Sequence, residues 1–324
     1  MLNVIIKLED YVMNNKKNKV IEIGLFSLIL VGLMIIASLF DLQISQLLTK
    51  GALKEGAFYT HNFMGALVEV IGSFPIFAAL LVATLALANH FFKKESKLKY
   101  LGWIFVVLSI VDMTWITRDT FKYILRLVGN EPLYKEWWMM IVYIAIGTPI
   151  ALVSQYFFQK RINTELNKKF ITFTWVILFT CAFYILVNII KGPVGRMRYR
   201  AMNELGDFGG YTAWYIISSA KETYGKLTIS DAFKSFPSGH TFSAGCCYVL
   251  IAVPDIFEKY NTKKYRIMSY IITVCYTGLV GLYRIRVGAH YLSDVTIGGT
   301  MAYVASQVAR YIFVTRKNKK LIND

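Results

Sequence analysis

The chain has 324 residues, of which 56% are hydrophobic and 15% aromatic, and its mean hydropathy of +0.46 is too high for an ordinary soluble domain. The apolar residues form long blocks of membrane-spanning length, which indicates an integral membrane protein. The formal net charge is +16, but most Lys and Arg residues lie in short runs between apolar blocks, as in the cytoplasmic loops of membrane proteins. Because no basic and aromatic stretch forms a continuous polar surface, we expect no nucleic acid among its partners.

The apolar blocks predict an all-α polytopic bundle of about eight spans. These occupy residues 20–40, 65–92, 100–116, 137–158, 170–190, 238–253, 267–282 and 289–314. We read the first block as an anchor and not a cleavable signal peptide, because a polar-rich segment precedes it and no small-residue cleavage site ends it cleanly. Asp112 and the charged pair at 118 and 119 shorten the third span. Without the third and fourth spans, six would remain and the later loops would keep the same sidedness.

The basic residues predict the orientation of the chain. Short basic loops follow the second, fourth and sixth predicted spans, at residues 93–99, 159–169 and 255–266, and both ends of the chain are basic. An even number of spans puts all of them on one side, which is the cytoplasm by the positive-inside rule. The abundance of Lys, Asn and Ile suggests a bacterial source. We therefore expect a single domain, residues 1–324, in a bacterial cytoplasmic membrane with both termini cytoplasmic.

Three polar clusters lie at predicted span boundaries, and all three fall on the outer side. The first covers residues 191–200, after the fifth span. The second covers residues 237–240, at the start of the sixth, and the third covers residues 284–294, between the seventh and eighth. The parts of one site must lie on one face of the membrane, and these clusters meet that requirement.

The second cluster has the pattern of a helix start. Pro237 closes a loop, Ser238 is a favoured N-cap, and an apolar run follows His240. A helix start offers free backbone N–H groups and the positive end of the helix dipole, which suit a phosphate. Gly239 has no side chain, so a ligand can approach its backbone closely. His240 is a candidate acid for the leaving group and a candidate base for the attacking water.

The other two clusters supply cations and a histidine–carboxylate pair. Lys191, Arg198 and Arg284 can bind phosphate oxygens. His290 and Asp294 are four residues apart near a predicted helix start, so they share a face. A carboxylate there can hold one imidazole nitrogen protonated and leave the other free as a nucleophile. This set fits phosphoester hydrolysis through a phosphohistidine, with no metal or other cofactor.

In this order, Lys-x6-Arg, Pro-Ser-Gly-His and Arg-x5-His-x3-Asp resemble the three signature motifs of the type-2 phosphatidic acid phosphatase superfamily. Its members include bacterial lipid phosphate phosphatases, and vanadium haloperoxidases share the core fold. The resemblance implies that His290 is the nucleophile, that Asp294 orients it and that His240 is the acid and base. It implies a phosphate cradle of Lys191, Arg198, Ser238, Gly239 and Arg284.

The chain departs from the family pattern in two places. The first motif usually ends in Arg-Pro, and here Tyr199 follows Arg198; the third usually begins with Ser-Arg, and here Tyr283 precedes Arg284. Neither departure removes a catalytic group, but both leave the subfamily open. The family core has six spans, so the predicted hairpin at residues 100–158 resembles an insertion.

Several polar residues lie outside the motifs. We expect Arg196 and Arg200 to be solvated or to face lipid headgroups. Glu69 and Asp112 are acids within apolar blocks, where charge is expensive, and the sequence leaves solvation and a role in the site equally open. The aromatic run at residues 211–217 is expected to lie in the membrane interface.

The remaining histidines and the cysteines show no metal-ligand spacing, so we expect neither a zinc site nor a disulfide framework. His61 and His90 lie at predicted span ends and are expected to be interfacial. The cysteines are expected to be small buried apolar residues. They are Cys181, Cys246, Cys247 and Cys275.

These observations favour a membrane lipid phosphatase that hydrolyses a lipid phosphate or diphosphate at the extracytoplasmic face. The motifs bind the phosphate, so an isoprenyl diphosphate, phosphatidylglycerophosphate and phosphatidic acid all remain open as substrates. A phosphotransferase using the same site is the alternative enzyme. A transporter or non-catalytic scaffold is a third possibility, which the acids in apolar blocks would support, although transport has no need for the three clusters. The expected partners are the substrate and membrane lipids, and the oligomeric state stays open.

Overall fold

The structure is a computed structural model that describes residues 2–59, 63–225 and 231–316, with the backbone alone described for residues 2–22. Within these ranges the regular elements are all helices, which confirms the predicted all-α class. In the described part of the chain, six helices are long and apolar enough to cross a membrane. They are Ile23–Thr49, Phe63–Phe92, Lys97–Leu127, Trp137–Arg161, Thr164–Leu205 and Lys263–Arg286.

The elements follow one another as antiparallel helices joined by short connections. In chain order they are α1 (Leu2–Thr49), α2 (Phe63–Phe92), η1 (Lys97–Tyr100), α3 (Leu101–Leu127), η2 (Glu131–Lys135), α4 (Trp137–Arg161), α5 (Thr164–Ala182), α6 (Tyr184–Val194), α7 (Tyr199–Leu205), α8 (Ala220–Tyr224), α9 (Gly239–Gly245), η3 (Cys246–Ala252), α10 (Val253–Ile256), η4 (Glu258–Tyr260), α11 (Lys263–Arg286), α12 (Leu292–Arg310) and η5 (Tyr311–Thr315).

The sixth and eighth predicted spans are helical but are not among the six long apolar helices. Residues predicted as the sixth span form α9, η3 and α10, so the helix type changes within the segment. Residues predicted as the eighth form α12 and the π-helical turn η5. Both segments carry polar residues in their first turns, as expected where helices begin at a polar site.

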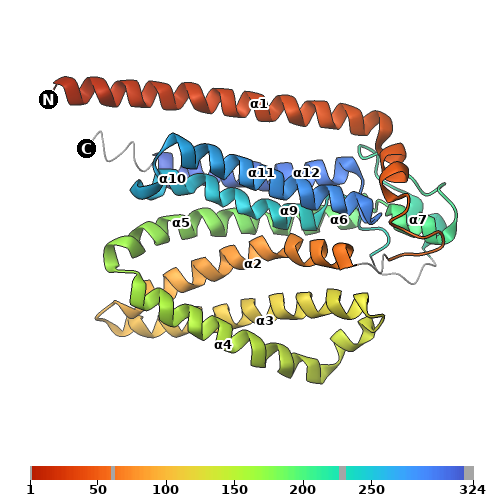
Figure 1. The fold of residues 1–324 in the computed structure, drawn as a ribbon, viewed down its shortest axis with the longest axis horizontal. Coiled ribbons are helices and arrows are strands. Elements are labelled where there is room, and N and C mark those ends of the chain that lie inside the picture. Colours follow the sequence, from red (N-terminus) through yellow and green to blue (C-terminus); the bar gives the residue numbers. More distant parts are fainter. Residues whose placement is uncertain (1, 60–62, 226–230, 317–324) are drawn as a thin grey trace.

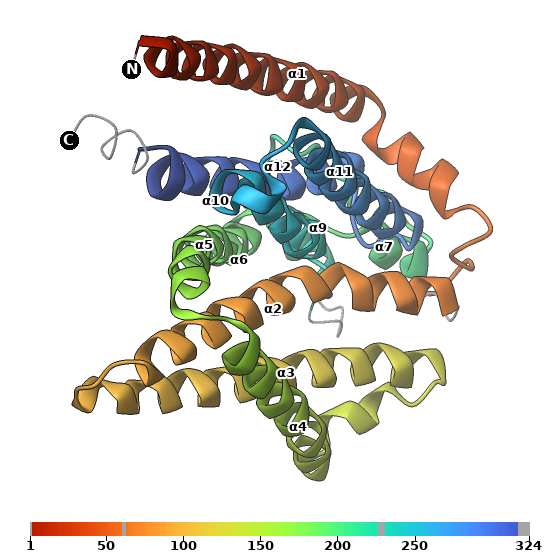
Figure 2. The same cartoon turned by 60° about the vertical axis from the view of Figure 1, so that its left-hand side comes forward.

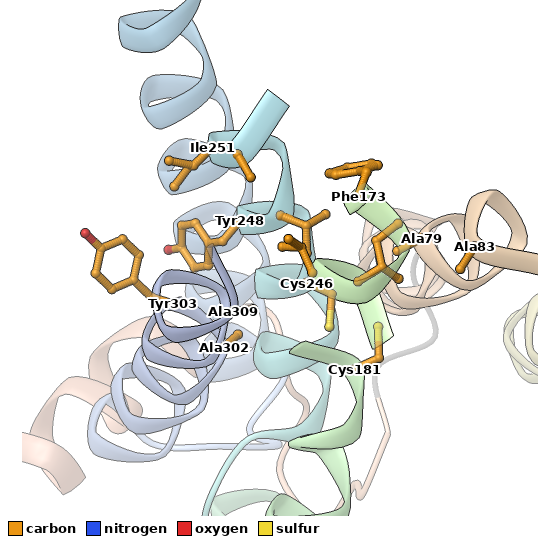
Figure 3. Close-up of a cluster of buried hydrophobic side chains, with 14 of the residues drawn as sticks. Ala79, Ala83, Phe173, Cys181, Cys246, Tyr248, Ile251, Ala302, Tyr303 and Ala309 are labelled. Carbon is orange, nitrogen blue, oxygen red and sulfur yellow. The ribbon is translucent and has the colours of Figure 1, made fainter. Parts of the chain in front are cut away.

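A central core joins α2, α5, η3 and α12 (Figure 3). Ala302 lies against Gly245, where an added Cβ would come within 2.6 Å of the alanine Cβ. Small residues at such contacts let helix backbones approach closely, as in other membrane bundles. Cys181 and Cys246 are buried in this core, whereas Cys275 is exposed on α11, so the expectation of burial was wrong for Cys275.

The helices α3 and α4 form an antiparallel hairpin that packs along α2, on the side away from α1 (Figures 1 and 2). Their backbones are close at Gly147, where an added Cβ would lie 2.7 Å from the amide nitrogen of Thr114. This hairpin corresponds to the predicted spans at 100–116 and 137–158, and α3 extends eleven residues beyond the predicted end, to Leu127. The extension carries charged residues to the end of the bundle where the site lies.

The bundle has two distinct ends (Figure 1). The described start of α1 and the end of α12 lie at one end, together with the α2–α3, α4–α5 and α10–α11 connections. The start of α9, the end of α11 and the start of α12 lie at the other, near α7. All three predicted polar clusters therefore occur at the end opposite the basic connections.

Candidate active site

His290 lies in the connection between α11 and α12, and its side chain is buried. Its Nδ1 lies 2.6 Å from the backbone carbonyl oxygen of Ser235. A carbonyl oxygen only accepts hydrogen bonds, so Nδ1 carries the proton in the neutral ring and Nε2 keeps a free lone pair. Asp294 Oδ2 is 3.7 Å from the same Nδ1, which is too far for a hydrogen bond. The proton-fixing partner is therefore the Ser235 carbonyl, while Asp294 acts on His290 through its charge.

Asp294 is held by contacts of its own. Its Oδ2 accepts from the Ser235 hydroxyl at 2.5 Å and from the Tyr291 amide at 2.9 Å, the latter completing a capping box at the start of α12. Its Oδ1 accepts from Arg196 Nη1 at 2.6 Å. These bonds fix the carboxylate, so Ser235 links Asp294 and His290 through both its hydroxyl and its carbonyl.

Arg196 lies at the centre of a buried ion-pair network. Its side chain is fully buried and also donates from Nη2 to Asp41 Oδ2 at 2.9 Å and from Nη1 to Ser293 Oγ at 2.7 Å. Asp41 directly follows Phe40, where non-helical dihedral angles kink α1. The expectation that Arg196 is solvated or faces headgroups was wrong, because its side chain is fully buried and both of its ion-pair partners are buried carboxylates. Removing one member of such a network leaves an unpaired buried charge, which costs about 3–5 kcal/mol.

The first and second motifs are joined through their backbones. The Ser235 amide donates to the Arg196 carbonyl at 3.0 Å, and the Arg198 amide donates to the Ala232 carbonyl at 2.8 Å. These two bonds lay the residues of the first motif beside the loop that precedes Pro237. The local pairing explains how two motifs about forty residues apart in sequence reach one site.

Asp231 holds two arginines of the first cluster. Its Oδ2 lies 3.5 Å from Arg198 Nη2 and 3.2 Å from Arg200 Nη2. Arg200 is buried and also lies over the Phe58 ring, so the expectation that it is solvated was wrong. Burial alone would raise the pKa of the Asp231 carboxyl, but the two guanidinium charges outweigh it and hold that pKa well below its usual range. The carboxylate therefore stays ionised well into the acid range.

Ser238 is the N-cap of α9, as predicted. Its hydroxyl accepts from the Thr241 amide at 3.3 Å, and its own amide donates to the Asp294 carbonyl at 3.0 Å. The start of α12 packs directly on this loop, since a Cβ at Gly298 would lie 2.4 Å from the Ser238 carbonyl oxygen. Both polar groups of Ser238 that could face a phosphate are thus engaged within the protein, and the residue shapes the loop.

His240 lies at the first turn of α9, one residue after Gly239. Its Nε2 is 2.7 Å from the hydroxyl of Tyr123 on α3. A Cβ at Gly239 would lie 3.1 Å from Lys191 Nζ, so the lysine ammonium lies directly beside this glycine. Lys191 is half-buried and makes no hydrogen bond or ion pair with any residue that the structure describes. An ammonium in such a place favours an anionic ligand.

Arg284, in the last turn of α11, is fixed from the side of α2. Its Nη1 donates to Glu69 Oε1 at 2.5 Å, and Glu69 Oε2 accepts from Arg126 Nη1 on α3 at 3.2 Å. The Arg284 Nε is buried and has no protein partner among the described residues. Glu69, for which the sequence left two roles open, is therefore a support of the site and not a solvated acid.

The structure brings the predicted site residues to one end of the bundle, from the end of α6 to the start of α12. Arg198 and Arg284 lie close enough to His290 for their positive charges to disfavour its protonation. Arg284, His290 and Lys191 act in the same way on His240. The sequence did not predict the residues that hold the site residues in place, which are Asp41, Tyr123, Arg126 and Ser235. An acid directly after a predicted span, on the side of the motifs, was the available signal for Asp41.

The other polar residues lie elsewhere. His90 is in the last turn of α2, at the basic end, and His61 falls outside the described residues. Asp112 is buried in α3 and has one oxygen without a partner in the described part of the chain. In the aromatic run, Trp214 donates to Ser38 Oγ at 3.0 Å and Ile217 is exposed, as expected for an interfacial segment. Among the described residues, no group of three or more His, Cys, Asp or Glu residues has metal-site geometry.

Comparisons with known proteins assign this region to a family. Residues 172–318 match the model of the PAP2 superfamily. The chain is 28% identical over 152 residues to lipid A 1-phosphatase of Rhizobium johnstonii, covering 44% of this chain and 52% of that protein. It is 35% identical over 83 residues to phosphatidylglycerophosphatase B of Bacillus subtilis, covering 26% and 40%. A lipid A 1-phosphatase of Rhizobium etli is 26% identical over 141 residues, covering 43% and 50%.

The chain thus spans about half or less of the length of each of these relatives. No solved structure matches it significantly. The family match contains every residue predicted to be catalytic or to bind phosphate, whereas α1 to α4 lie outside it.

Proposed function

The chain carries a PAP2 superfamily domain at residues 172–318, and from this premise we propose that it is a membrane lipid phosphatase. In this proposal, it hydrolyses a lipid phosphate or diphosphate through a phosphohistidine intermediate at the extracytoplasmic face. The names of its relatives point to phosphorylated lipid substrates, namely a lipid A phosphate and phosphatidylglycerophosphate. The observation that carries the proposal is the buried His290, whose Nδ1 donates to a carbonyl and whose Nε2 is free.

The phosphate binds next to that nitrogen. Lys191, Arg198 and the Arg284 Nε, which has no protein partner among the described residues, supply positive charge, and the backbone at Gly239 allows close approach. Arginine guanidinium groups suit the planar oxygens of a phosphoryl group in transfer. Each cation is fixed or confined by neighbours before substrate arrives, so little reorganisation is required at the moment of reaction.

In the first step, the Nε2 lone pair of His290 attacks phosphorus and the bond from phosphorus to the lipid oxygen breaks. His240 gives a proton to that leaving oxygen, which departs as the lipid alcohol, or as the lipid monophosphate when the substrate is a diphosphate. The positive charge that develops on His290 is balanced by Asp294, 3.7 Å from its Nδ1.

In the second step, a water oxygen attacks the phosphohistidine phosphorus and the phosphorus–nitrogen bond breaks. The neutral His240 takes a proton from the water, which restores its acid form, and inorganic phosphate leaves. Both steps use only groups of this chain and water. Because the paired residues Asp41, Glu69, Arg196 and Asp294 come from segments spread along the whole sequence, we also propose that residues 1–324 act as one domain.

The test is phosphate release from a panel of lipid phosphates and diphosphates by the purified protein, with EDTA present. The panel contains a lipid A phosphate, phosphatidylglycerophosphate, phosphatidic acid and an isoprenyl diphosphate. Wild type is compared with His290→Ala and with His90→Ala, a control at the opposite end of α2. We expect release that survives EDTA, a loss of at least about a thousandfold in His290→Ala, and no change in His90→Ala.

Two further observations make the test decisive. With a radiolabelled substrate, wild type should form an acid-labile phosphoenzyme that His290→Ala lacks. Release that requires an added lipid or sugar acceptor would identify a phosphotransferase instead. Release that persists in His290→Ala, or that EDTA abolishes, would contradict the histidine mechanism.

A further inference from the structure

The helix α3 lies outside the family match, yet two of its side chains reach the candidate active site. The hydroxyl of Tyr123 is 2.7 Å from His240 Nε2, and the tyrosine side chain is only 3% exposed. Arg126 contacts Glu69, which in turn contacts Arg284. Positions three apart in a helix lie on one face, so a single face of α3 serves both contacts.

The contact with Tyr123 fixes which edge of the His240 ring is available. The Cδ2 edge packs against α2, 3.5 Å from the position of a Cβ at Gly72. Nε2, next to Cδ2 in the ring, is bound to the Tyr123 hydroxyl. Nδ1 is therefore the nitrogen left to face a leaving oxygen. In the protonated ring, Nε2–H donates to the tyrosine oxygen and Nδ1–H donates to the leaving group.

The contact with Arg126 fixes the phosphate-binding arginine. Arg126 forms a two-bond pair with Glu131, with Nε and Nη2 at 3.0 and 2.6 Å from the carboxylate oxygens, so it is itself held rigidly. It also lies over the Tyr59 ring, with 3.9 Å from its guanidinium carbon to the ring centroid. Glu69 is thus shared between two arginines, and its position relative to Arg284 depends on the placement of α3.

We propose that Tyr123 and Arg126 are positioning residues for the reaction, and that the α3–α4 hairpin completes the active site by orienting His240 and Arg284. This inference rests on the proposed function. It assigns a role to a segment outside the family match: Tyr123 acts on protonation of the leaving group, and Arg126 acts on phosphate binding. The two residues should therefore differ in which kinetic constant they control.

Tyr123→Phe removes the hydroxyl and keeps the ring. The matched control is Tyr143→Phe on α4 of the same hairpin, which is equally buried and donates to the Tyr134 carbonyl at 3.2 Å. Two substrates are compared in the first step alone, as the pre-steady-state rate at which the leaving group is released: an alkyl lipid phosphate, whose leaving oxygen needs a proton, and p-nitrophenyl phosphate, whose leaving group departs without one. General acid catalysis contributes about 10²–10⁴-fold, and misorientation of the acid should forfeit part of that.

We expect Tyr123→Phe to lower this first-step rate for the lipid phosphate by about 10–100-fold, with KM within about twofold and the first-step rate for p-nitrophenyl phosphate within about twofold. Tyr143→Phe should match wild type on both substrates. Adding Tyr123→Phe to His240→Ala should cause no further loss, because residues that act as a unit are not additive. Equal losses on both substrates, or additive losses in the double variant, would overturn the role of Tyr123.

For Arg126, we expect Arg126→Gln to raise KM about tenfold or more for both substrates, since Arg284 loses its fixed partner. Arg126→Lys should restore part of the affinity. An unchanged KM in a variant that keeps the wild-type melting temperature would overturn this part. If Arg126→Gln does not fold, the KM of Arg126→Lys is compared with that of wild type, and an unchanged KM would overturn this part.

The same substrates separate this inference from the proposed function. Loss of both activities in His290→Ala, with a selective loss in His240→Ala of the first step for the lipid substrate, supports the proposed function independently of α3. Tyr123→Phe indistinguishable from Tyr143→Phe would then refute the inference alone. A wild-type protein that hydrolyses neither substrate would refute both.

Discussion

The tautomer of His290 follows from one hydrogen bond. Nδ1 is 2.6 Å from a carbonyl oxygen that has no proton to give. The less common Nδ1–H form of imidazole is thereby selected, and the nucleophilic nitrogen is Nε2. Asp294 strengthens this arrangement through Ser235, whose hydroxyl donates a hydrogen bond to Asp294 Oδ2 at 2.5 Å.

The expected outcome is direct: in protein labelled with ¹⁵N-histidine, His290 should show a protonated Nδ1 and an unprotonated Nε2 at neutral pH. The chain has four histidines, so loss of one set of signals in His290→Gln identifies the residue. Nitrogen-15 correlation spectra in detergent micelles are the measurement. A His290 ring protonated on Nε2 alone would contradict the geometry and remove the proposed nucleophile.

Spacing in the sequence predicted that His290 and Asp294 share a helix-start face, and the capping box places Asp294 in the first turn of α12. It did not predict the role of Arg196. A Lys/Arg-rich cluster beside a membrane looks like a headgroup contact, because sequence shows the cations but not the acids that fold against them. Asp41 is 155 residues away along the chain, and no local pattern connects the two.

Between elements, the closest contact at the site is between α12 and the loop that begins α9. Gly298 lets the backbone of Ser238 approach, because a Cβ would lie 2.4 Å from the carbonyl oxygen. The helices that carry His240 and Asp294 therefore meet through backbone atoms. The distance between the start of α9 and α12 therefore depends on residue 298 being a glycine.

Gly298→Ala should push α12 away from the Ser238 loop. We expect a loss of about 1–3 kcal/mol in stability from overpacking and a larger proportional loss in kcat, since His240 and His290 move apart. Thermal unfolding and phosphate release measure the two effects. Gly278→Ala on α11, where nothing lies within 4 Å of the added Cβ, is the control: it should leave kcat unchanged and should not lower stability, because alanine is the better helix former. Full activity in Gly298→Ala would contradict the assigned contact.

Helix positions were largely predictable, since an apolar block of spanning length has few alternatives to a helix in a membrane. The length of α3 was not. Charged residues after position 116 were taken as the end of a span, whereas α3 continues to Leu127. Its cations are paired or lie against aromatic rings: Arg126 pairs with Glu131, and Arg118 and Lys122 lie over rings. Tertiary partners thus decided where this helix ends.

At the scale of the whole molecule, the candidate site and the basic connections lie at opposite ends of the bundle (Figure 1). The long α1 spans between these ends and kinks at Phe40, just before the acid that pairs with Arg196. From this arrangement and the positive-inside rule, we propose that the site faces outward.

Cysteine labelling tests that orientation. Lys221→Cys lies in α8 near the site end, and Lys97→Cys lies in η1 at the basic end; both positions are exposed. A membrane-impermeant maleimide should label Lys221→Cys in intact cells and Lys97→Cys only after permeabilisation, relative to the background of the wild-type cysteines. Labelling of Lys97→Cys from outside would reverse the proposed topology.

The motifs alone were sufficient to predict the end of the bundle at which the site forms, because topology and charge both place them there. Which helices complete the site was beyond the sequence. Glu69, Tyr123 and Arg126 contribute because α2 and α3 bring them against residues 172–318. The hydropathy of a membrane helix says little about which other helices it packs against.

The Arg196 network has a consequence for how the protein is made. It joins Asp41, on α1, to Asp294, on α12. A nascent chain exposes the first acid long before its counterion exists, and Arg196 in turn awaits α12. Under the proposed function, the active centre is therefore complete only once α12 has been made and inserted, and a chain that stops before α12 carries no centre able to act on surrounding lipids.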